Sequence, residues 1–194
     1  KTTLSINLAS GLAKQYYISV VDADPQCSAL QWRAFAEHQD TIPVFEANDA
    51  IADQVAELLQ DYHYVVIDCP PSVHAPQTNA VLEFGDLALI PVQPSPVDLW
   101  ATVHIEQAIE RAHATNPSLQ AMLVINQIET RTTLSRLVRE ALSAIALPVA
   151  NTSLRRRAVY RNSALEGKSV FDMGRRGADA AEEFDQLIRE IVSS

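Results

Sequence analysis

Lys1-Thr2-Thr3 opens the chain and leads directly into an amphipathic stretch from Leu4 to Leu12. A lysine and a hydroxyl at the start of a helix form the last part of the phosphate-loop pattern G-x-x-x-x-G-K-[ST]. There the lysine neutralises β- and γ-phosphate oxygens, the hydroxyl ligates magnesium, and the positive end of the helix dipole faces the phosphates. The triplet alone also fits an ordinary helix start, so its assignment to a nucleotide site depends on the residues that follow.

The glycines of the phosphate-loop pattern would lie before Lys1. Their backbone N–H groups wrap the phosphates, and a central parallel strand leads into them. We therefore expect roughly a dozen further residues upstream of Lys1, which is the length of one strand and the loop.

Two predicted strands end in acidic residues. One ends in the segment Val20-Val21-Asp22-Ala23-Asp24-Pro25-Gln26, and the other, Tyr64–Ile67, runs into Asp68. Asp22 and Asp24 lie on the same side of an extended chain, so one can be structural or metal-linked while the other orients an attacking water. Asp68 is placed to hold a magnesium ion through a bound water. Both segments also fit solvated turns at strand ends, where aspartate is common.

Two further residues extend the candidate site. Asn126 ends the strand Met122–Ile125, and its amide can donate to and accept from adenine at once, although asparagine there is also a common turn former. Pro70 belongs to a rigid proline pair after Asp68, which by its position would set the path of a loop beside the γ-phosphate. The candidate nucleotide contacts are Lys1, Thr2, Thr3, Asp22, Pro70 and Asn126.

Strand-like apolar runs alternate with helix-period segments along the whole chain, which predicts an α/β fold of one domain over residues 1–194. Several strands are continuously apolar, which indicates a doubly wound, mostly parallel sheet of the P-loop NTPase type with helices on both faces. In such sheets ligands bind beyond the carboxyl ends of the strands. The predicted strands are Ile18–Asp22, Pro43–Phe45, Tyr64–Asp68, Leu87–Val92, Ala121–Asn126 and Pro148–Val149. The predicted helices are Lys1–Gln15, Ala29–His38, Asp49–Gln60, Asn79–Phe84, Val97–Thr115, Thr133–Ile145, Arg157–Leu165 and Ala178–Val192.

The composition is typical of a soluble globular protein, with 47% hydrophobic and 20% charged residues among 194. No apolar run approaches the roughly 18 residues that span a bilayer, and no signal peptide is visible. Cys27 and Cys69 are too few for a disulfide framework, so we expect a reducing cytoplasm and two idle thiols rather than a redox pair.

The charge is unevenly distributed. The net charge is −9, yet residues 155–176 carry seven basic and two acidic side chains, a local charge of +5. Such a segment on an acidic body can bind a polyanion at one face. It can equally be a solvated helix face whose basic side chains pair with the acidic remainder.

Taken together, these motifs resemble the ParA/MinD family of deviant Walker ATPases, and within it the small ParA-type partition proteins. Lys1-Thr2-Thr3 is similar to the end of the family's K-G-G-x-G-K-T-T loop. Val21–Gln26 resembles its V-D-x-D-P-Q segment, with Cys27 where glycine is common, and Val66–Ser72 resembles I-D-x-P-P-S. Further stretches that look like ParA are Ile90–Ser95, Arg157–Tyr160 and Glu166–Val170.

The resemblance implies a role for each candidate residue. Lys1 and Thr2 would bind phosphate and magnesium, and Lys1 would also be catalytic. Asp24 would orient the hydrolytic water. Asp68 would hold the metal through water, and Asn126 would contact adenine.

The resemblance also implies ATP/ADP and Mg2+ as cofactors and a homodimer that closes when ATP binds. A second family lysine, located before Lys1, would reach the phosphates bound by the partner subunit. The dimer would bind DNA without sequence preference, and the candidate contacts are Arg155, Arg156, Arg157 and Arg161. A cargo-linked activator of the ParB type would trigger an otherwise slow hydrolysis and release the protein from the nucleoid in the cytoplasm. The cargo would be a plasmid, a chromosome or a protein assembly.

Two other classes of function remain open from the sequence. A MinD-like membrane switch would need a basic amphipathic C-terminal helix, whereas the tail from Ala180 to Glu190 is acidic, so we expect no membrane partner. A P-loop metabolic enzyme is the second alternative. Its iron–sulfur reductase form needs cysteines placed for a shared cluster, and Cys69 directly after Asp68 does not resemble that placement.

Overall fold

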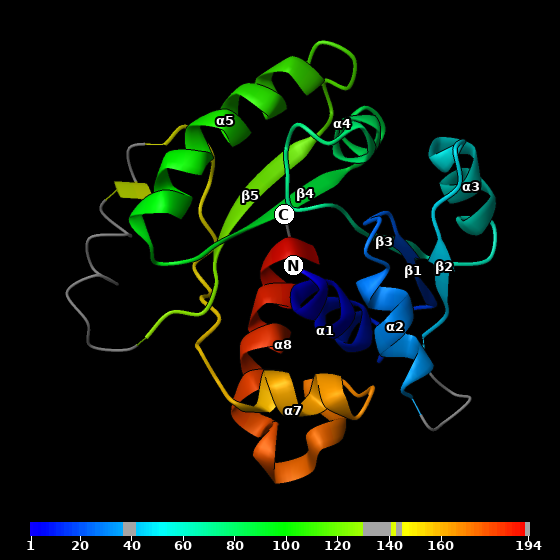
Figure 1. The fold of residues 1–194 in the computed structure, drawn as a ribbon, viewed down its shortest axis with the longest axis vertical. Helices are drawn as coiled ribbons and strands as arrows, with labels where there is room; N and C mark the ends of the chain where they lie inside the picture. Colours follow the sequence, from blue (N-terminus) through cyan, green and yellow to red (C-terminus); the bar gives the residue numbers. More distant parts are fainter. Residues whose placement is uncertain (37–41, 130–140, 143–144, 193–194) are drawn as a thin grey trace.

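The computed structural model describes residues 1–36, 42–129, 141–142 and 145–192. Its described strands pair in parallel and form two sheets, one in the order β2-β1-β3 and one that pairs β4 with β5 (Figure 1). The strands are β1 (Ile18–Asp22), β2 (Val44–Glu46), β3 (Tyr64–Asp68), β4 (Leu87–Val92) and β5 (Gln120–Ile125). The five corresponding predictions are confirmed to within two residues at each end, and the sixth, Pro148–Val149, is an isolated parallel bridge from Val149 to Leu123.

The helices also follow the prediction closely. They are α1 (Thr2–Leu12), α2 (Ser28–Ala34), α3 (Ile51–Leu58), α4 (Pro76–Leu82), α5 (Pro96–Ala112), α7 (Val159–Leu165) and α8 (Ala178–Val192). The predicted helix Thr133–Ile145 falls almost wholly outside the described residues. One element was not predicted, the 3-10 helix η1 (Val170–Arg176), which begins at a capping box in which Ser169 and Asp172 bind each other's backbone N–H groups.

Helices cover both faces of the β2-β1-β3 sheet. Successive residues of a strand point to opposite faces. Val20 therefore packs with α1, α2 and α8, whereas Val21 packs with Ile51 and Val55 of α3. The two residues are fully buried. The doubly wound α/β class predicted from the continuous apolar strands is confirmed.

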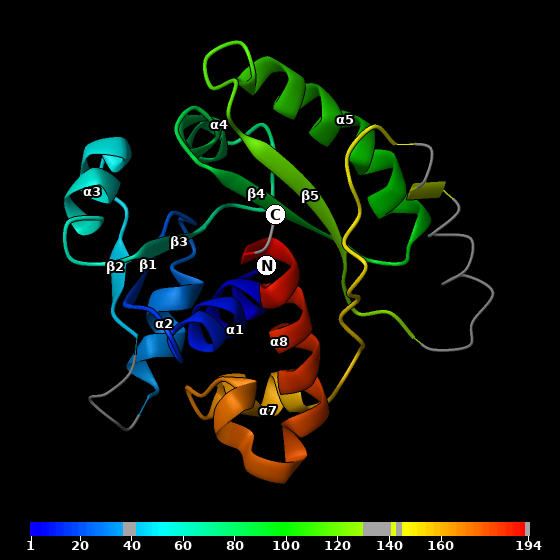
Figure 2. The ribbon, with the colours of Figure 1, turned by 180° about the vertical axis from the view of Figure 1, so that it is seen from behind.

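Helix α1 lies in the core between the sheet and the C-terminal helix, and both views place it against α8 (Figures 1 and 2). The amphipathic face of α8 supplies Ala180, Phe184 and Leu187, which are buried at helical spacing. Asn7 is the buried polar residue of α1. Its side chain donates to the Thr3 carbonyl at 2.7 Å and accepts from the Val170 N–H at 2.7 Å. The second bond joins the middle of α1 to the start of η1, and together the two satisfy the buried amide.

Candidate nucleotide-binding site

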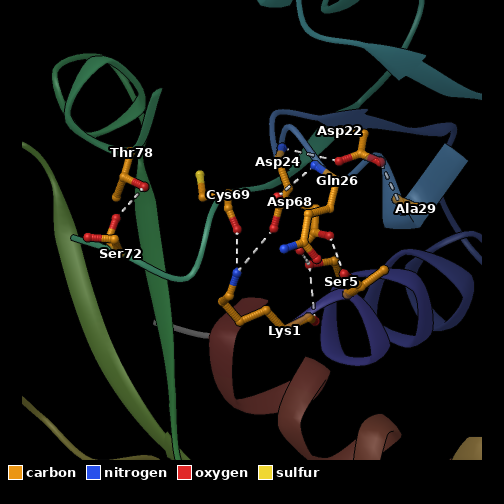
Figure 3. Close-up of polar contacts among 11 residues, drawn as sticks. Lys1, Ser5, Asp22, Asp24, Gln26, Ala29, Asp68, Cys69, Ser72 and Thr78 are labelled. Atoms are coloured by element: carbon orange, nitrogen blue, oxygen red, sulfur yellow. Dashed lines mark hydrogen bonds and ion pairs between the residues drawn. The ribbon is translucent and has the colours of Figure 1, made fainter. Parts of the chain in front are cut away.

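The first turn of α1 faces the carboxyl ends of β1 and β3. Asp22 and Asp68 are register partners, so the two strands end side by side, and the Asp24 segment continues past that edge. The Lys1 ammonium donates to the Cys69 carbonyl at 2.8 Å and lies 3.7 Å from Asp24 Oδ2 (Figure 3). Three residues predicted from separate motifs therefore meet at one point, Lys1, Asp24 and Asp68.

Two hydroxyls of α1 hold the Asp68 carboxylate. Thr2 Oγ1 donates to Asp68 Oδ2 at 2.6 Å, and Ser5 Oγ donates to Oδ1 at 2.8 Å. Asp68 is only 1% exposed, so these bonds compensate for the loss of its water contacts. Thr2 and Asp68, which were each predicted as magnesium contacts, are hydrogen-bonded to each other. Ser5 was not predicted.

Asp22 and Asp24 have different surroundings. Asp22 accepts bonds from the N–H groups of Asp24 and of Ala29 in the first turn of α2 (Figure 3). It also accepts one from the Leu30 N–H. Burial raises the pKa of the Asp22 carboxyl, while these N–H groups act in the other direction. Asp22 is therefore occupied in holding the start of α2. Asp24 accepts a bond from the Gln26 N–H through Oδ1, and its Oδ2 faces Lys1.

A cavity of about 510 Å3 opens beside the first residues of α1. Asn126 lines it together with Lys1, and among the described residues no hydrogen bond of its side chain is found. Gln127, which follows it, adopts a left-handed backbone with φ 57° and lines the same space. Besides Asn126 and Gln127, the lining residues are Lys1, Thr3, Leu4, Leu154, Arg156, Arg157, Ala158, Tyr160, Arg161, Ala164 and Phe184.

The two cysteines lie close to the acids. Burial, with a further contribution from Asp68, raises the pKa of the Cys69 thiol to about 11, so the thiol stays protonated and unreactive at neutral pH. Pro70, which follows it, is buried. Cys27 has φ 50° immediately before α2. Glycine adopts this left-handed conformation without the steric cost that a side chain brings.

Residues 1–170 match the family described as the CobQ/CobB/MinD/ParA nucleotide binding domain. The chain belongs to this family. A relative from Halothiobacillus neapolitanus, named "Maintenance of carboxysome distribution protein A", is 42% identical over all of this chain and 91% of its own length.

Solved structures of the family share the fold. The MinD cell division protein of Aquifex aeolicus superimposes with a TM-score of 0.76 over 100% of this chain and 91% of its own, at 15% identity. An ATP complex of Cyanothece McdA, which carries one aspartate-to-alanine change, gives a TM-score of 0.72 over 99% of this chain and 91% of its own, at 17% identity. The chain is thus a ParA/MinD-type P-loop protein in fold.

The donor set at the α1 start suits a hard cation. Thr2 and Asp68 offer a hydroxyl and a carboxylate oxygen, the ligand types that magnesium prefers. Magnesium is usually held by one or two such groups together with substrate phosphates and water. In the described part of the chain no group of three or more His, Cys, Asp or Glu side chains could hold a metal.

Three of the four predicted DNA-contacting arginines carry ion pairs. Arg156 Nη1 lies 2.9 Å from Glu129. Arg157 contacts Asp179 at 3.1 Å and Glu183 at 2.7 Å, and its side chain is only 22% exposed. The arginine therefore fastens the segment before α7 to α8, and its bond to Glu183 raises the pKa of the guanidinium.

The other two arginines are exposed. Arg155 Nε lies 3.5 Å from Glu183 Oε1, a loose contact of a half-exposed side chain. For Arg161 no ion pair is found among the residues that the structure describes. The alternative in which the basic segment pairs with acidic neighbours thus applies fully to Arg157 and least to Arg161.

Proposed function

We propose that this protein is a positioning ATPase of the McdA type, which binds ATP and Mg2+, dimerises, binds nucleoid DNA and is reset by slow, partner-stimulated hydrolysis. One observation carries the proposal: Lys1, Thr2, Asp24 and Asp68 converge at the first turn of α1, beside a cavity that Asn126 lines. The relative named for carboxysome distribution supports the carboxysome as the cargo.

Each residue of the site has a separate task in this proposal. Lys1 and the N-terminus of α1 neutralise the terminal phosphates, and Thr2 with Asp68 holds the metal, which when bound offsets charge on the β- and γ-phosphate oxygens. Asp24 is 8% exposed, so it can orient a water at the edge of the site while bulk solvent is kept away. Asn126 pairs with the edge of the adenine.

DNA binding is assigned to the exposed arginines rather than to the whole basic segment. Exposed ion pairs contribute little to stability, so Arg155 and Arg156 can exchange a carboxylate for a DNA phosphate at small cost. Arg161 needs no such exchange with the described residues. Arg157 contributes by holding the segment in place.

The test is retention on non-specific duplex DNA with ATP and with ADP over a salt series. We expect retention with ATP only, and an affinity whose log–log slope against salt is roughly −0.9 per neutralised phosphate. Arg161→Ala should reduce that slope by about one unit, because one phosphate contact is lost. Arg111→Ala, which removes an exposed arginine from the last turn of α5, is the control and should bind as the unmodified protein does.

Equal retention with ADP and ATP would contradict the proposed switch. Liposome flotation is the parallel measurement, because ATP-dependent flotation without DNA retention would favour a membrane-bound regulator. We expect none, because the polar face of α8 carries Glu182, Glu183 and Asp185 where an interfacial helix needs lysine or arginine. No helix in the described ranges is both long and apolar enough to cross a membrane.

The proposed cargo has its own test. Deleting the gene in a host that makes carboxysomes should change their distribution from evenly spaced to clustered, as followed with a fluorescent shell protein. The Asp24→Ala variant supplied in its place should leave the carboxysomes clustered, because a protein that does not reset cannot redistribute its cargo. Normal spacing in the deletion strain would exclude this cargo while leaving the ATP-dependent switch intact.

A further inference from the structure

Asp68 is held differently from the other acids of the site. Asp22 and Asp24 each accept a backbone N–H, so the fold of their own segment fixes their carboxylates. The described residues provide Asp68 with two side-chain hydroxyls instead, one on each carboxylate oxygen. The orientation of this buried carboxylate therefore depends on α1.

The two hydroxyls come from one face of that helix. Thr2 and Ser5 are three residues apart, so they lie one above the other and both face the end of β3. Ser5 also approaches the Lys1 carbonyl, but at 3.4 Å that bond is long. Its short bond, at 2.8 Å, goes to Asp68 Oδ1.

Ser10, on the same helix, shows the ordinary behaviour of a helical serine. Its hydroxyl donates at 2.8 Å to the Ile6 carbonyl, four residues earlier, which is the usual local bond of serine within a helix. Ser5 occupies the equivalent position relative to Lys1, yet its hydroxyl is directed across to β3. Ser5 therefore donates its short hydrogen bond to Asp68 rather than to a carbonyl of its own helix.

We propose that Ser5 is a positioning residue for the metal site: it fixes the plane of the Asp68 carboxylate so that Oδ2 stays beside Thr2. This inference rests on the proposed function, because it assumes that Thr2 and Asp68 hold Mg2+ next to the nucleotide. A carboxylate held at one oxygen alone can rotate about its last bond, and Thr2 then has no fixed partner. Partners of this kind behind a metal ligand typically change metal affinity by 10- to 100-fold.

The test measures the Mg2+ concentration that gives half-maximal binding of a fluorescent ATP analogue to the whole protein. Ser5→Ala should raise this concentration about tenfold or more, while the affinity for the analogue in EDTA stays close to that of the unmodified protein. The melting temperature should fall by a few degrees, because one oxygen of the buried Asp68 carboxylate loses its donor. Ser5→Thr, which restores a hydroxyl, should recover most of the loss. Ser10→Ala is the matched control, since it removes a hydroxyl from the same helix but leaves Asp68 untouched.

The outcomes separate this inference from the proposal on which it rests. If Ser5→Ala and Ser10→Ala share the Mg2+ midpoint of the unmodified protein, Ser5 has no positioning role, although the ATP site stands. An equal loss of analogue affinity with and without Mg2+ would also overturn the inference, because it would mark a general structural defect. If the unmodified protein binds no analogue at any Mg2+ concentration, both the site and the role of Ser5 are wrong.

Discussion

Asp24→Ala is expected to slow ATP turnover by a factor of about 10² to 10⁴, while ATP binding and ATP-dependent DNA retention persist. The reason is geometric. Asp24 Oδ2 lies 3.7 Å from the Lys1 ammonium, which places the carboxylate at the end of the site where the terminal phosphate would meet water. Its removal takes away the group that orients this water but none of the groups assigned to hold the nucleotide. Phosphate release in single-turnover experiments, with ATP binding measured alongside, is the direct check.

Asp61→Ala is the matched control for this change. Asp61 is an exposed aspartate shortly before β3, so it lies toward the amino end of the strand whose carboxyl end carries Asp68. The Asp61→Ala substitution should leave ATP turnover and ATP affinity unaltered. Asp24→Ala should still fold, because it loses one ion pair with the 32% exposed Lys1 and one bond from the Gln26 N–H, which each contribute about 1 kcal/mol to the free energy of unfolding. Turnover at the normal rate in Asp24→Ala would remove Asp24 from the mechanism and leave hydrolysis unassigned.

The strands and the points where they end could be read from the sequence because the signal is local. Tyr64–Asp68 and Leu87–Val92 are apolar runs bounded by polar or turn residues, and both were predicted with the bounds observed. Parallel pairing then brings the carboxyl ends to one edge, so Asp22 and Asp68 were expected near each other before any contact was known. Helix α4 begins three residues earlier than predicted, at Pro76, which is a favoured residue for a first helical position.

The partners of particular side chains could not be predicted, since they join distant segments. Arg157 and Glu183 are 26 residues apart, and nothing in either segment specifies that they meet. Ser5 and Asp68 are 63 residues apart, although the three-residue spacing of Ser5 from Thr2 was a usable signal. The 3-10 helix η1 depends on a capping box and on Gly174 with φ 55°, features that break the helical period which sequence patterns reveal.

Lys1→Ala is expected to weaken ATP binding by about 100-fold, the second large effect at this site. A hydrogen bond to a charged group typically contributes about 1.5–3 kcal/mol, which corresponds to roughly 10- to 150-fold in affinity. The upper part of this range applies, because Lys1 would also screen the phosphates from the neighbouring Asp24 carboxylate. Titration of a fluorescent ATP analogue, in the presence of Mg2+, measures the change.

Lys14→Ala separates this effect from the loss of any positive charge near α1. The Lys14 ammonium pairs with Asp185 at 2.8 Å and lies 3.9 Å from the centre of the Phe171 ring, just past the end of α1 that is remote from the site. Its replacement should lower the free energy of unfolding by about 1 kcal/mol or less and leave ATP affinity unchanged. Similar losses in the two variants would show that the net charge of the helix matters rather than the position of Lys1. A loss confined to Lys1→Ala would tie phosphate binding to the one ammonium that meets the ends of β1 and β3.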